Sequence, residues 1–212
     1  MIYPQQMKLY FVRHGESEAN TRRVISNGES LFGLTPLGKK QANILAAKLK
    51  DILITAIYSS PVLRARETAD ILSQSLHQPY QVTEALCEYD CGILEEQSDA
   101  ASWIMHREIA EDWTLNHNYL RKPKGGESFL DIQNRFLPFI ETLTHDGLHT
   151  NHHVLFVGHG GLFQLMLPLI LTNVDDVFVR SHGIEHTDCV IAEQQAGGLV
   201  CLQWGQFKFG NP

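Results

Sequence analysis

Two arginines and two histidines are the residues of this sequence that could carry out chemistry together, because each lies at or shortly after the end of a β-rich segment: Arg13, His14, Arg64 and His159. A guanidinium group offers planar, forked donors that match the oxygens of a phosphoryl group. An imidazole can donate a hydrogen bond to such an oxygen or attack phosphorus through a free ring nitrogen. If the fold gathers these side chains, their positive charge needs an anion, and a tetrahedral phosphoryl group fits best.

Three predicted strands, at residues 8–12, 54–60 and 154–157, end just before these side chains. The first and the third run into glycine turns, and the second ends at Pro61. In open α/β sheets, ligands bind in the crevice beyond the carboxyl ends of the strands. We therefore expect the two arginines and the two histidines to face one crevice.

The rest of the chain alternates helices with strands. Thr35-Pro36 has the form of an N-cap followed by proline at the first helical position. The spacing of apolar residues predicts helices over 36–52, 65–76, about 99–113 and 129–143, the last kinked by Pro138. A short strand at 79–86 and a final hairpin at 189–204, with Gly197-Gly198 at its turn, complete the pattern. The pattern predicts an α/β fold, a three-layer α/β/α arrangement with a mostly parallel central sheet.

Residues 93–127 depart from this pattern, since their periodicity is poor apart from one helix. We predict a single domain over 1–212 with a cap-like insertion at about 93–127, which lies over the sheet and lines the entrance to the crevice. Its aromatic residues, Trp103 and Trp113 among them, would suit a sugar or another flat group. A basic run in it is either a solvated surface or a contact for an anionic substrate tail, and the sequence does not decide: Arg121, Lys122 and Lys124.

The composition excludes several classes of protein. The net charge of −7 over 212 residues argues against general nucleic-acid binding. The longest apolar stretch, Leu162 to Leu171, is far short of the roughly 18–20 residues of a membrane span, and no signal peptide is apparent. The four cysteines contain no C-x-x-C pair, so we expect reduced thiols and a cytoplasmic protein. The sequence leaves the oligomeric state open, a homodimer included.

The segment RHGESEAN at 13–20 resembles the R-H-G-E-[ST]-x-x-N signature of the histidine phosphatase superfamily, the phosphoglycerate-mutase-like proteins. The resemblance continues, in the family's order and spacing, over residues 8–165, through LTPLGKKQA, YSSPVLRARETA, LCEYDCG, GGES and VGHGG. The Arg-His-Gly triplet alone would carry little weight, whereas the ordered set is specific. The resemblance implies a phosphoglycerate-mutase-like fold.

The resemblance also implies roles for matched residues. His14 would be the nucleophile that forms a phosphohistidine, with one ring nitrogen attacking and the other held by a hydrogen bond. Glu88 would protonate the leaving oxygen and then activate water. The positions that hold the phosphoryl group in the family correspond here to Arg13, Asn20, Arg64, His159 and Gly160. Glu16 is assigned to structure, as a partner of an arginine or a turn amide.

The stretch after Glu88 favours a phosphatase over a mutase. Cofactor-dependent mutases carry a segment like E-R-x-Y-G-x-L-x-G-L-N-K, and EYDCGILEEQSD lacks its arginine, its second glycine and its Asn-Lys pair. It is closer to the L-x-E-x-x-x-G-x-x-E-G of many family phosphatases, except that Glu96 replaces the last glycine. We predict a metal-independent phosphatase without cofactors that acts on a small-molecule phosphomonoester. A phosphoglycerate mutase and a non-catalytic phosphate-binding scaffold are the alternatives, and the physiological substrate stays open.

Other motifs in the chain have plainer interpretations. GHGG is similar to an esterase oxyanion loop, but the chain has no G-x-S-x-G nucleophile turn. Cys87, beside Glu88, is interpreted as a small buried residue, and Arg66 as a structural or rim residue. Four histidines form a loose run with no tight ligand spacing, which favours a solvated turn over the metal site of a metal-dependent hydrolase: His145, His149, His152 and His153.

Overall fold

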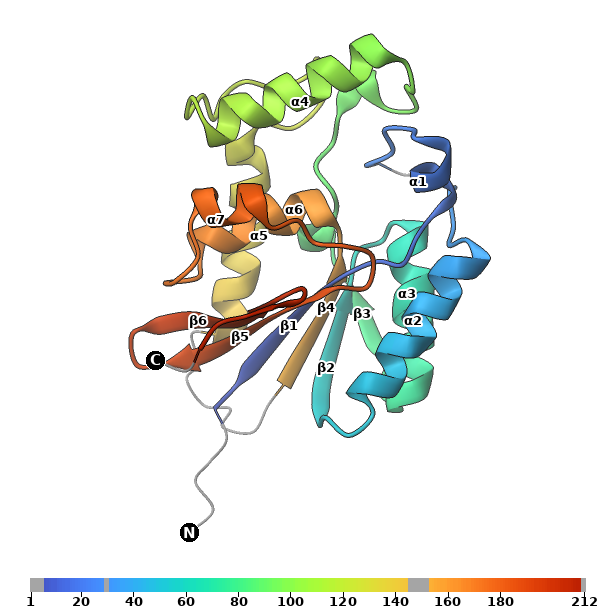
Figure 1. The fold of residues 1–212 in the computed structure, drawn as a ribbon, viewed down its shortest axis with the longest axis vertical. Helices are drawn as coiled ribbons and strands as arrows, with labels where there is room; N and C mark the ends of the chain where they lie inside the picture. Colours follow the sequence, from blue (N-terminus) through green and yellow to red (C-terminus); the bar gives the residue numbers. More distant parts are fainter. Residues whose placement is uncertain (1–5, 29–30, 145–152, 211–212) are drawn as a thin grey trace.

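The computed structural model describes residues 6–28, 31–144 and 153–210. In this part of the chain one sheet of seven strands runs in the order β3-β2-β4-β1-β5-β6-β7 (Figure 1). The strands are β1 (Lys8–Arg13), β2 (Ile54–Ser59), β3 (Tyr80–Val82), β4 (His153–Gly158), β5 (Cys189–Gln195), β6 (Gly198–Trp204) and β7 (Phe207–Lys208). The three strands predicted to end at the candidate residues are therefore β1, β2 and β4, and they are neighbours in the sheet.

The central strands are parallel. β4 pairs in parallel with both β1 and β2, and β2 with β3, whereas β5, β6 and β7 follow in antiparallel order. In the register of β1 and β4, Arg13 lies opposite Gly158, so the two chains leave the sheet at the same level. This register brings the segments that begin at His14 and at His159 side by side, as the rule for carboxyl ends of strands requires.

Helices cover both faces of the sheet and produce three layers (Figure 1). On one face, α2 (Pro36–Leu49) and α3 (Leu63–Leu76) bury their apolar stripes, including Leu45 and Leu72, against Val12 of β1. On the other face, α5 (Phe129–Thr144) and α6 (Gly160–Met166) pack on alternate residues of the same strands. β1 is thus apolar on both faces, as expected of a strand inside a parallel sheet. The predicted α/β/α fold class is confirmed.

The segment at 93–127 contains α4 (Ala100–Thr114), which matches the helix predicted at about 99–113. α4 lies beyond the carboxyl ends of the parallel strands, at the top of Figure 1. Trp113, in the last turn of α4, is fully buried. Its ring lies edge-on to that of Tyr89, with 5.3 Å between the ring centroids. The indole of Trp103 donates to the carbonyl oxygen of Arg23, near the end of the short helix α1 (Glu18–Arg22). Two aromatic residues therefore anchor α4 over the edge of the sheet where the candidate residues lie.

Some local features differ from the sequence expectations. The hairpin turn consists of Ala196 and Gly197, while Gly198, at φ 121°, is the first residue of β6. The helices α1, α6 and α7 (Asp176–Ser181) were not predicted, because helices of five to seven residues are too short to show a period of 3.6. No helix among the described residues has the length and apolarity needed to cross a bilayer.

Gly38 gives a prediction for stability. It lies in the first turn of α2, where the hydroxyl of Thr35 accepts from its backbone N–H, and a methyl group on its Cα would overlap the carbonyl oxygen of Glu16. Alanine favours a helix over glycine by about 1 kcal/mol, whereas overpacking against backbone costs about 1–3 kcal/mol or more. We expect the cost of the steric overlap to exceed the gain in helix propensity, so Gly38→Ala should lower the free energy of unfolding.

Chemical denaturation of the Gly38→Ala variant measures this. Gly197→Ala is the matched control, because nothing lies within 4 Å of a methyl group placed there. A Gly38→Ala variant as stable as the wild type would show that the 13–17 segment does not pack on α2 as described.

Candidate active site

His14 is the first residue after β1 and is only 3% exposed. Its Nδ1 lies 2.7 Å from the carbonyl oxygen of Gly15. Because a carbonyl oxygen only accepts, Nδ1 carries the ring proton and Nε2 keeps its lone pair. The Nε of Arg64 donates to this Nε2 at 3.0 Å. The backbone therefore sets the tautomer that leaves one nitrogen of His14 nucleophilic.

The surroundings of His14 also keep its ring neutral. Burial lowers the pKa of His14 well below the usual value for histidine, and the positive charges of Arg64 and Arg13 lower it further. The hydrogen bond to Gly15 opposes this shift but is the smaller effect. A neutral imidazole is the form that can attack an electrophile.

Arg64 and His159 complete a buried cluster around His14. Arg64 lies in the first turn of α3 and is 3% exposed, and His159 is the N-cap of α6 and is fully buried. Nη2 of Arg64 lies 3.2 Å from Nδ1 of His159, whose Nε2 lies 2.9 Å from the hydroxyl oxygen of Ser60. The His14 and His159 rings lie 5.2 Å apart. Burial lowers the pKa of Arg64 to about 10, so its guanidinium remains charged at neutral pH.

Arg13, which is partly exposed, adds a second guanidinium near His14. Its Nη1 donates to the carbonyl oxygen of Ile184 at 2.7 Å. Its Nε is buried and has no hydrogen-bond partner in the described part of the chain. A methyl group on Gly160 would lie 3.2 Å from this Nε, so Gly160 leaves room for the Arg13 side chain. Burial lowers the pKa of Arg13, and the nearby Glu88 carboxylate opposes that shift.

Glu88 points its carboxyl group at the N-terminus of α6. Its Oε2 accepts from the backbone N–H of Gly161 at 2.9 Å, and its Oε1 accepts from that of Leu162 at 2.6 Å. Burial raises the pKa of Glu88, although these two amides and Arg64 favour its ionised form. The carboxyl group is thus held in a fixed orientation, with a proton affinity above that of an exposed glutamate.

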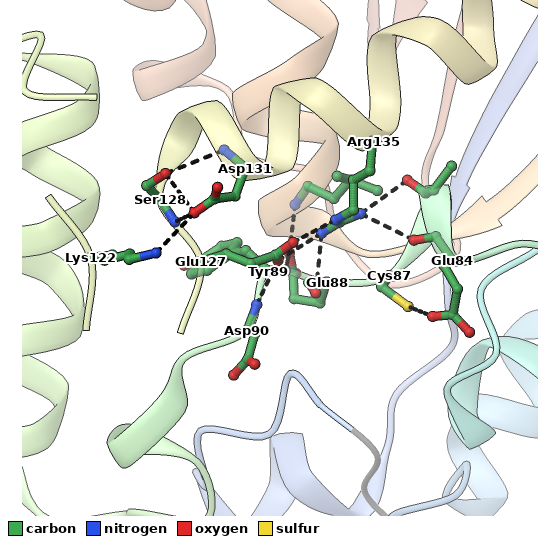
Figure 2. Close-up of polar contacts among 12 residues, drawn as sticks. Glu84, Cys87, Glu88, Tyr89, Asp90, Lys122, Glu127, Ser128, Asp131 and Arg135 are labelled. Carbon is green, nitrogen blue, oxygen red and sulfur yellow. Dashed lines mark hydrogen bonds and ion pairs between the residues drawn. The ribbon is translucent and has the colours of Figure 1, made fainter. Parts of the chain in front are cut away.

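A second set of contacts holds the segment that carries Glu88 (Figure 2). Arg135 of α5 donates to the carbonyl oxygens of Ala85 at 3.0 Å and Glu88 at 3.4 Å. The same guanidinium binds both carboxylate oxygens of Glu127, at 2.8 and 3.1 Å. Glu127 in turn accepts from the backbone N–H of Asp90 at 2.9 Å. The GGES motif recognised in the sequence therefore acts, through Glu127 and Arg135, on both ends of the Glu88 segment.

Asn20 lies at the rim of the cluster. It occupies the third position of α1, where its side-chain oxygen accepts from the backbone N–H of Ser17 at 3.0 Å. The same oxygen lies 3.0 Å from Nε2 of His186. The structure thus brings together Arg13, His14, Arg64, Glu88, His159 and Gly160 in one place, with Asn20 connected to them through His186.

His186 is a polar residue of the site that the sequence interpretation missed. Its Nε2 lies 3.2 Å from Nη2 of Arg13. It belongs to the short segment Ile184–Asp188, which precedes β5 and contains no periodic pattern or known motif. The only sequence signal for His186 was its place just before a predicted strand. Because β5 pairs antiparallel with β1, the start of β5 lies beside the end of β1, where Arg13 and His14 are.

A cleft of about 850 Å³ adjoins the cluster at Glu88, and we call it the Glu88 cleft. Apolar residues of the α3 N-terminus and Leu31 form part of its wall. Its charged lining residues are four carboxylates and two guanidinium groups: Glu84, Glu88, Asp90, Glu127, Arg66 and Arg135. Arg66 therefore lines the rim, one of the two positions expected for it.

The remaining candidates have structural partners. The carboxylate of Glu16 accepts from the hydroxyl of Thr35 at 2.7 Å, so the hydrogen-bond partner seen in the described residues is a hydroxyl rather than an arginine or a turn amide. Cys87 is half-buried rather than buried, and its thiol donates to Glu84. Burial, together with Glu84, raises the pKa of Cys87 to about 12, which argues against a reactive thiolate. All four cysteines are free thiols.

The basic run and the histidine run do not converge on the cluster in the described residues. Arg121 binds Asp112 at 2.6 Å, and Lys122 lies 3.3 Å from Asp131. Of the four clustered histidines, His145, His149 and His152 lie outside the described residues, and His153 is the buried first residue of β4. Within 6–28, 31–144 and 153–210, no three His, Cys, Asp or Glu side chains are grouped so that they could hold a metal ion.

A three-layer α/β fold with histidines and arginines gathered at the carboxyl edge of the sheet defines the histidine phosphatases as a class. The chain belongs to the histidine phosphatase superfamily (branch 1), whose sequence profile matches residues 9–206. The family and the enzyme class predicted from the sequence, a histidine phosphatase, are confirmed.

Among the similar proteins, some are named as phosphatases and others as phosphoglycerate mutases. The chain is 30% identical over 183 residues to putative phosphoserine phosphatase 2 of Hydrogenobacter thermophilus, covering 84% of this chain and 87% of that protein. It is also 30% identical over 165 residues to the probable phosphoglycerate mutase GpmB of Proteus mirabilis, covering 78% of this chain and 75% of the relative. Among solved structures, Bacillus stearothermophilus YhfR superimposes with a TM-score of 0.80 at 27% identity over 95% of this chain and 98% of that one. A mycobacterial glucosyl-3-phosphoglycerate phosphatase, with a TM-score of 0.78, 22% identity and coverage of 93% and 98%, shows the same fold.

Proposed function

We propose that this protein hydrolyses a small-molecule phosphomonoester through a phosphohistidine on Nε2 of His14, without a metal or another cofactor. The observation that carries the proposal is the fixed tautomer of a buried, neutral His14 between two guanidinium groups. Glu88, with its raised pKa, is close enough to interact with both arginines. A nucleophile, charge stabilisation and a proton donor are the three parts that phosphoryl transfer needs.

In the first step, the Nε2 lone pair of His14 attacks phosphorus, and the bond from phosphorus to the ester oxygen breaks. Glu88 gives its proton to the departing alkoxide. The Nε–H of Arg64 binds the same lone pair in the free protein, so the phosphoryl oxygens must draw Arg64 away before attack. Together with Arg13 and His159, it then offsets the charge spread over the phosphoryl oxygens.

In the second step, Glu88 accepts a proton from water, and the water oxygen bonds to phosphorus as the phosphorus–nitrogen bond breaks. His14 regains its lone pair, and inorganic phosphate leaves. Asn20 and the backbone at Gly160 are assigned to phosphate binding. α4 and its flanking loops act as a cap, which is supported by their position beyond the strand ends (Figure 1).

The charges of the Glu88 cleft favour hydrolysis of a phosphomonoester whose alcohol part is neutral or cationic over interconversion of phosphoglycerates. A phosphoglycerate brings a carboxylate, which needs a cation. Of the two guanidinium groups that line the Glu88 cleft, that of Arg135 already binds Glu127. With that pair cancelled and Glu88 protonated as the acid, two carboxylates, Glu84 and Asp90, lie with Arg66 in the lining and would oppose another anion. The phosphoglycerate mutase, which the name of one relative suggests, is therefore the second candidate.

Hydrolysis of p-nitrophenyl phosphate with and without chelator tests the proposal. We expect turnover in metal-free buffer and no change on adding EDTA, because the arginines rather than a cation supply the positive charge. A metal-dependent hydrolase would lose its activity to EDTA, and a scaffold would bind phosphate without turnover.

A screen of phosphomonoesters should include 3-phosphoglycerate with 2,3-bisphosphoglycerate. Efficient interconversion of 3- and 2-phosphoglycerate would replace the phosphatase by the mutase.

A further inference from the structure

The loop before β5 carries a third imidazole to the site. His186 is half-buried, and its ring centroid lies 6.0 Å from that of His14, compared with 5.2 Å for His159. The mechanism above gives it no task. Its ring nevertheless lies nearly as close to the nucleophile as that of His159, to which the proposed function assigns a contact with the phosphoryl oxygens.

The backbone of this loop is held firmly against the end of β1. The N–H of Thr187 donates to the carbonyl oxygen of Arg13 at 3.0 Å, and the N–H of Arg13 donates to that of Asp188 at 3.3 Å. Thr187 has a φ of 60°, a left-handed conformation that a β-branched residue seldom adopts. Such backbone strain is concentrated at functional sites, where it fixes a neighbouring side chain. Here the neighbouring side chain is that of His186.

The contacts of His186 cannot both be hydrogen bonds. Its Nε2 lies 3.2 Å from Nη2 of Arg13, which only donates, and 3.0 Å from Oδ1 of Asn20, which only accepts. The backbone N–H of Ser17 donates to this same oxygen, which fixes the orientation of the Asn20 amide. If Nε2 carries the proton, it pairs with Asn20 and faces an N–H of Arg13. If it does not, it pairs with Arg13 and faces an oxygen lone pair.

An oxyanion would resolve this conflict. An oxygen placed between Arg13 and His186 accepts from both Nη2 and a protonated Nε2. The buried Nε of Arg13, which lacks a partner in the described part of the chain, adds a further donor beside them. Buried donors without an acceptor are costly, and an ionised acceptor forms the strongest bonds with them.

We propose that His186 is a further phosphoryl-binding residue, whose Nε2–H and the Arg13 guanidinium together hold one oxygen of the substrate's phosphoryl group. This inference rests on the proposed function of the His14 site. Burial and the Arg13 charge lower the pKa of His186 to about 4, and Glu16 opposes them, so the ring donates as a neutral group. It therefore adds a hydrogen bond without adding a third full charge to the site.

Binding of inorganic phosphate to the full chain tests the inference, measured both by calorimetry and by inhibition of p-nitrophenyl phosphate hydrolysis. His186→Ala should weaken phosphate binding about 10- to 100-fold, the range for a hydrogen bond to a charged group. It should raise KM more than it lowers kcat. His186→Gln, whose side-chain amide can donate from a similar position, should bind more tightly than His186→Ala. His77→Asn, at the exposed C-cap of α3 and outside the cap, is the control.

A double-mutant comparison separates direct contact from an effect through Arg13. If His186 touches the phosphoryl group, His186→Ala should weaken phosphate binding further in an Arg13→Ala protein. No further loss there would mean that His186 only orients Arg13, and direct contact would be wrong. Thermal unfolding of each variant identifies any that do not fold, in which case His186→Gln decides.

These experiments distinguish a failure of the inference about His186 from a failure of the proposed function. A wild type that hydrolyses p-nitrophenyl phosphate, together with His186 variants that bind phosphate as tightly as the wild type, overturns the inference alone. A wild type that neither hydrolyses the ester nor binds phosphate overturns the proposed function, and the inference with it.

Discussion

Replacing His14 with alanine is expected to reduce kcat for p-nitrophenyl phosphate by at least about 10⁴-fold, as loss of a covalent nucleophile does in other enzymes. The two flanking guanidinium groups would still bind phosphate, but they cannot form a bond to phosphorus. The phosphate affinity should therefore change far less than the rate. Steady-state kinetics and calorimetry with inorganic phosphate measure these two quantities separately.

The same experiment can detect the intermediate. Rapid quenching of the wild type with a radiolabelled phosphomonoester should leave label on the protein that is stable in base and lost in acid, as a phosphorus–nitrogen bond is. His14→Ala should carry none, and His77→Asn should match the wild type. Label on the His14→Ala protein, or activity close to that of the wild type, would place the nucleophile elsewhere.

The pH dependence follows from the surroundings of His14. Its pKa is lowered well below that of an exposed histidine, so the ring stays neutral as the pH falls through the usual range of histidine titration. No loss of kcat/KM from protonation of His14 is therefore expected near pH 6.5. An NMR signal that titrates near pH 6.5 and is missing from the spectrum of His14→Ala would show that the ring is more exposed than described.

Glu88→Gln is expected to lower the rate with an alkyl phosphate by roughly 10²- to 10⁴-fold, the usual contribution of a general acid or base. The amide of glutamine can still pair with the α6 N-terminus, but it has no proton to give and accepts none from water. With p-nitrophenyl phosphate, whose leaving group needs little protonation, the first step should be much less affected. The phosphoenzyme should then accumulate, because its hydrolysis still lacks a base.

The raised pKa of Glu88 gives the sign of its pH effect. Protonated Glu88 is the acid, so cleavage of an alkyl phosphate should slow as the pH rises through that raised pKa. Ionised Glu88 is the base, so hydrolysis of the phosphoenzyme should slow as the pH falls through the same value. Rapid-quench measurements of each step against pH, with p-nitrophenyl and alkyl esters, check both trends. Equal losses for the two esters in Glu88→Gln, with no accumulation of label, would contradict the dual role.

The fold was predictable because most of its determinants are local. Thr35-Pro36 begins a helix through an N-cap and a fixed proline φ, and α2 starts there in the structure. The apolar run before Arg13 indicates a strand covered on both faces, and β1 is that strand. The short helices α6 and α7 were not predicted, because one or two helical turns show no periodic pattern of apolar residues. The hairpin turn was predicted one residue too late, because either glycine suits a turn.

For the candidate site too, some features could be predicted from the sequence and others depend on the tertiary structure. By itself, the sequence determined that Arg13-His14 and His159 stand at the ends of strands, because residue order and turn chemistry are local, and its resemblance to the family pointed to Glu88. Only the tertiary structure decided that Nε2 of His14 meets Arg64, 50 residues away, that Arg135 holds the Glu88 segment, and that His186 reaches Arg13. These contacts depend on the order β3-β2-β4-β1-β5, and long-range strand pairing leaves no periodic trace along the chain.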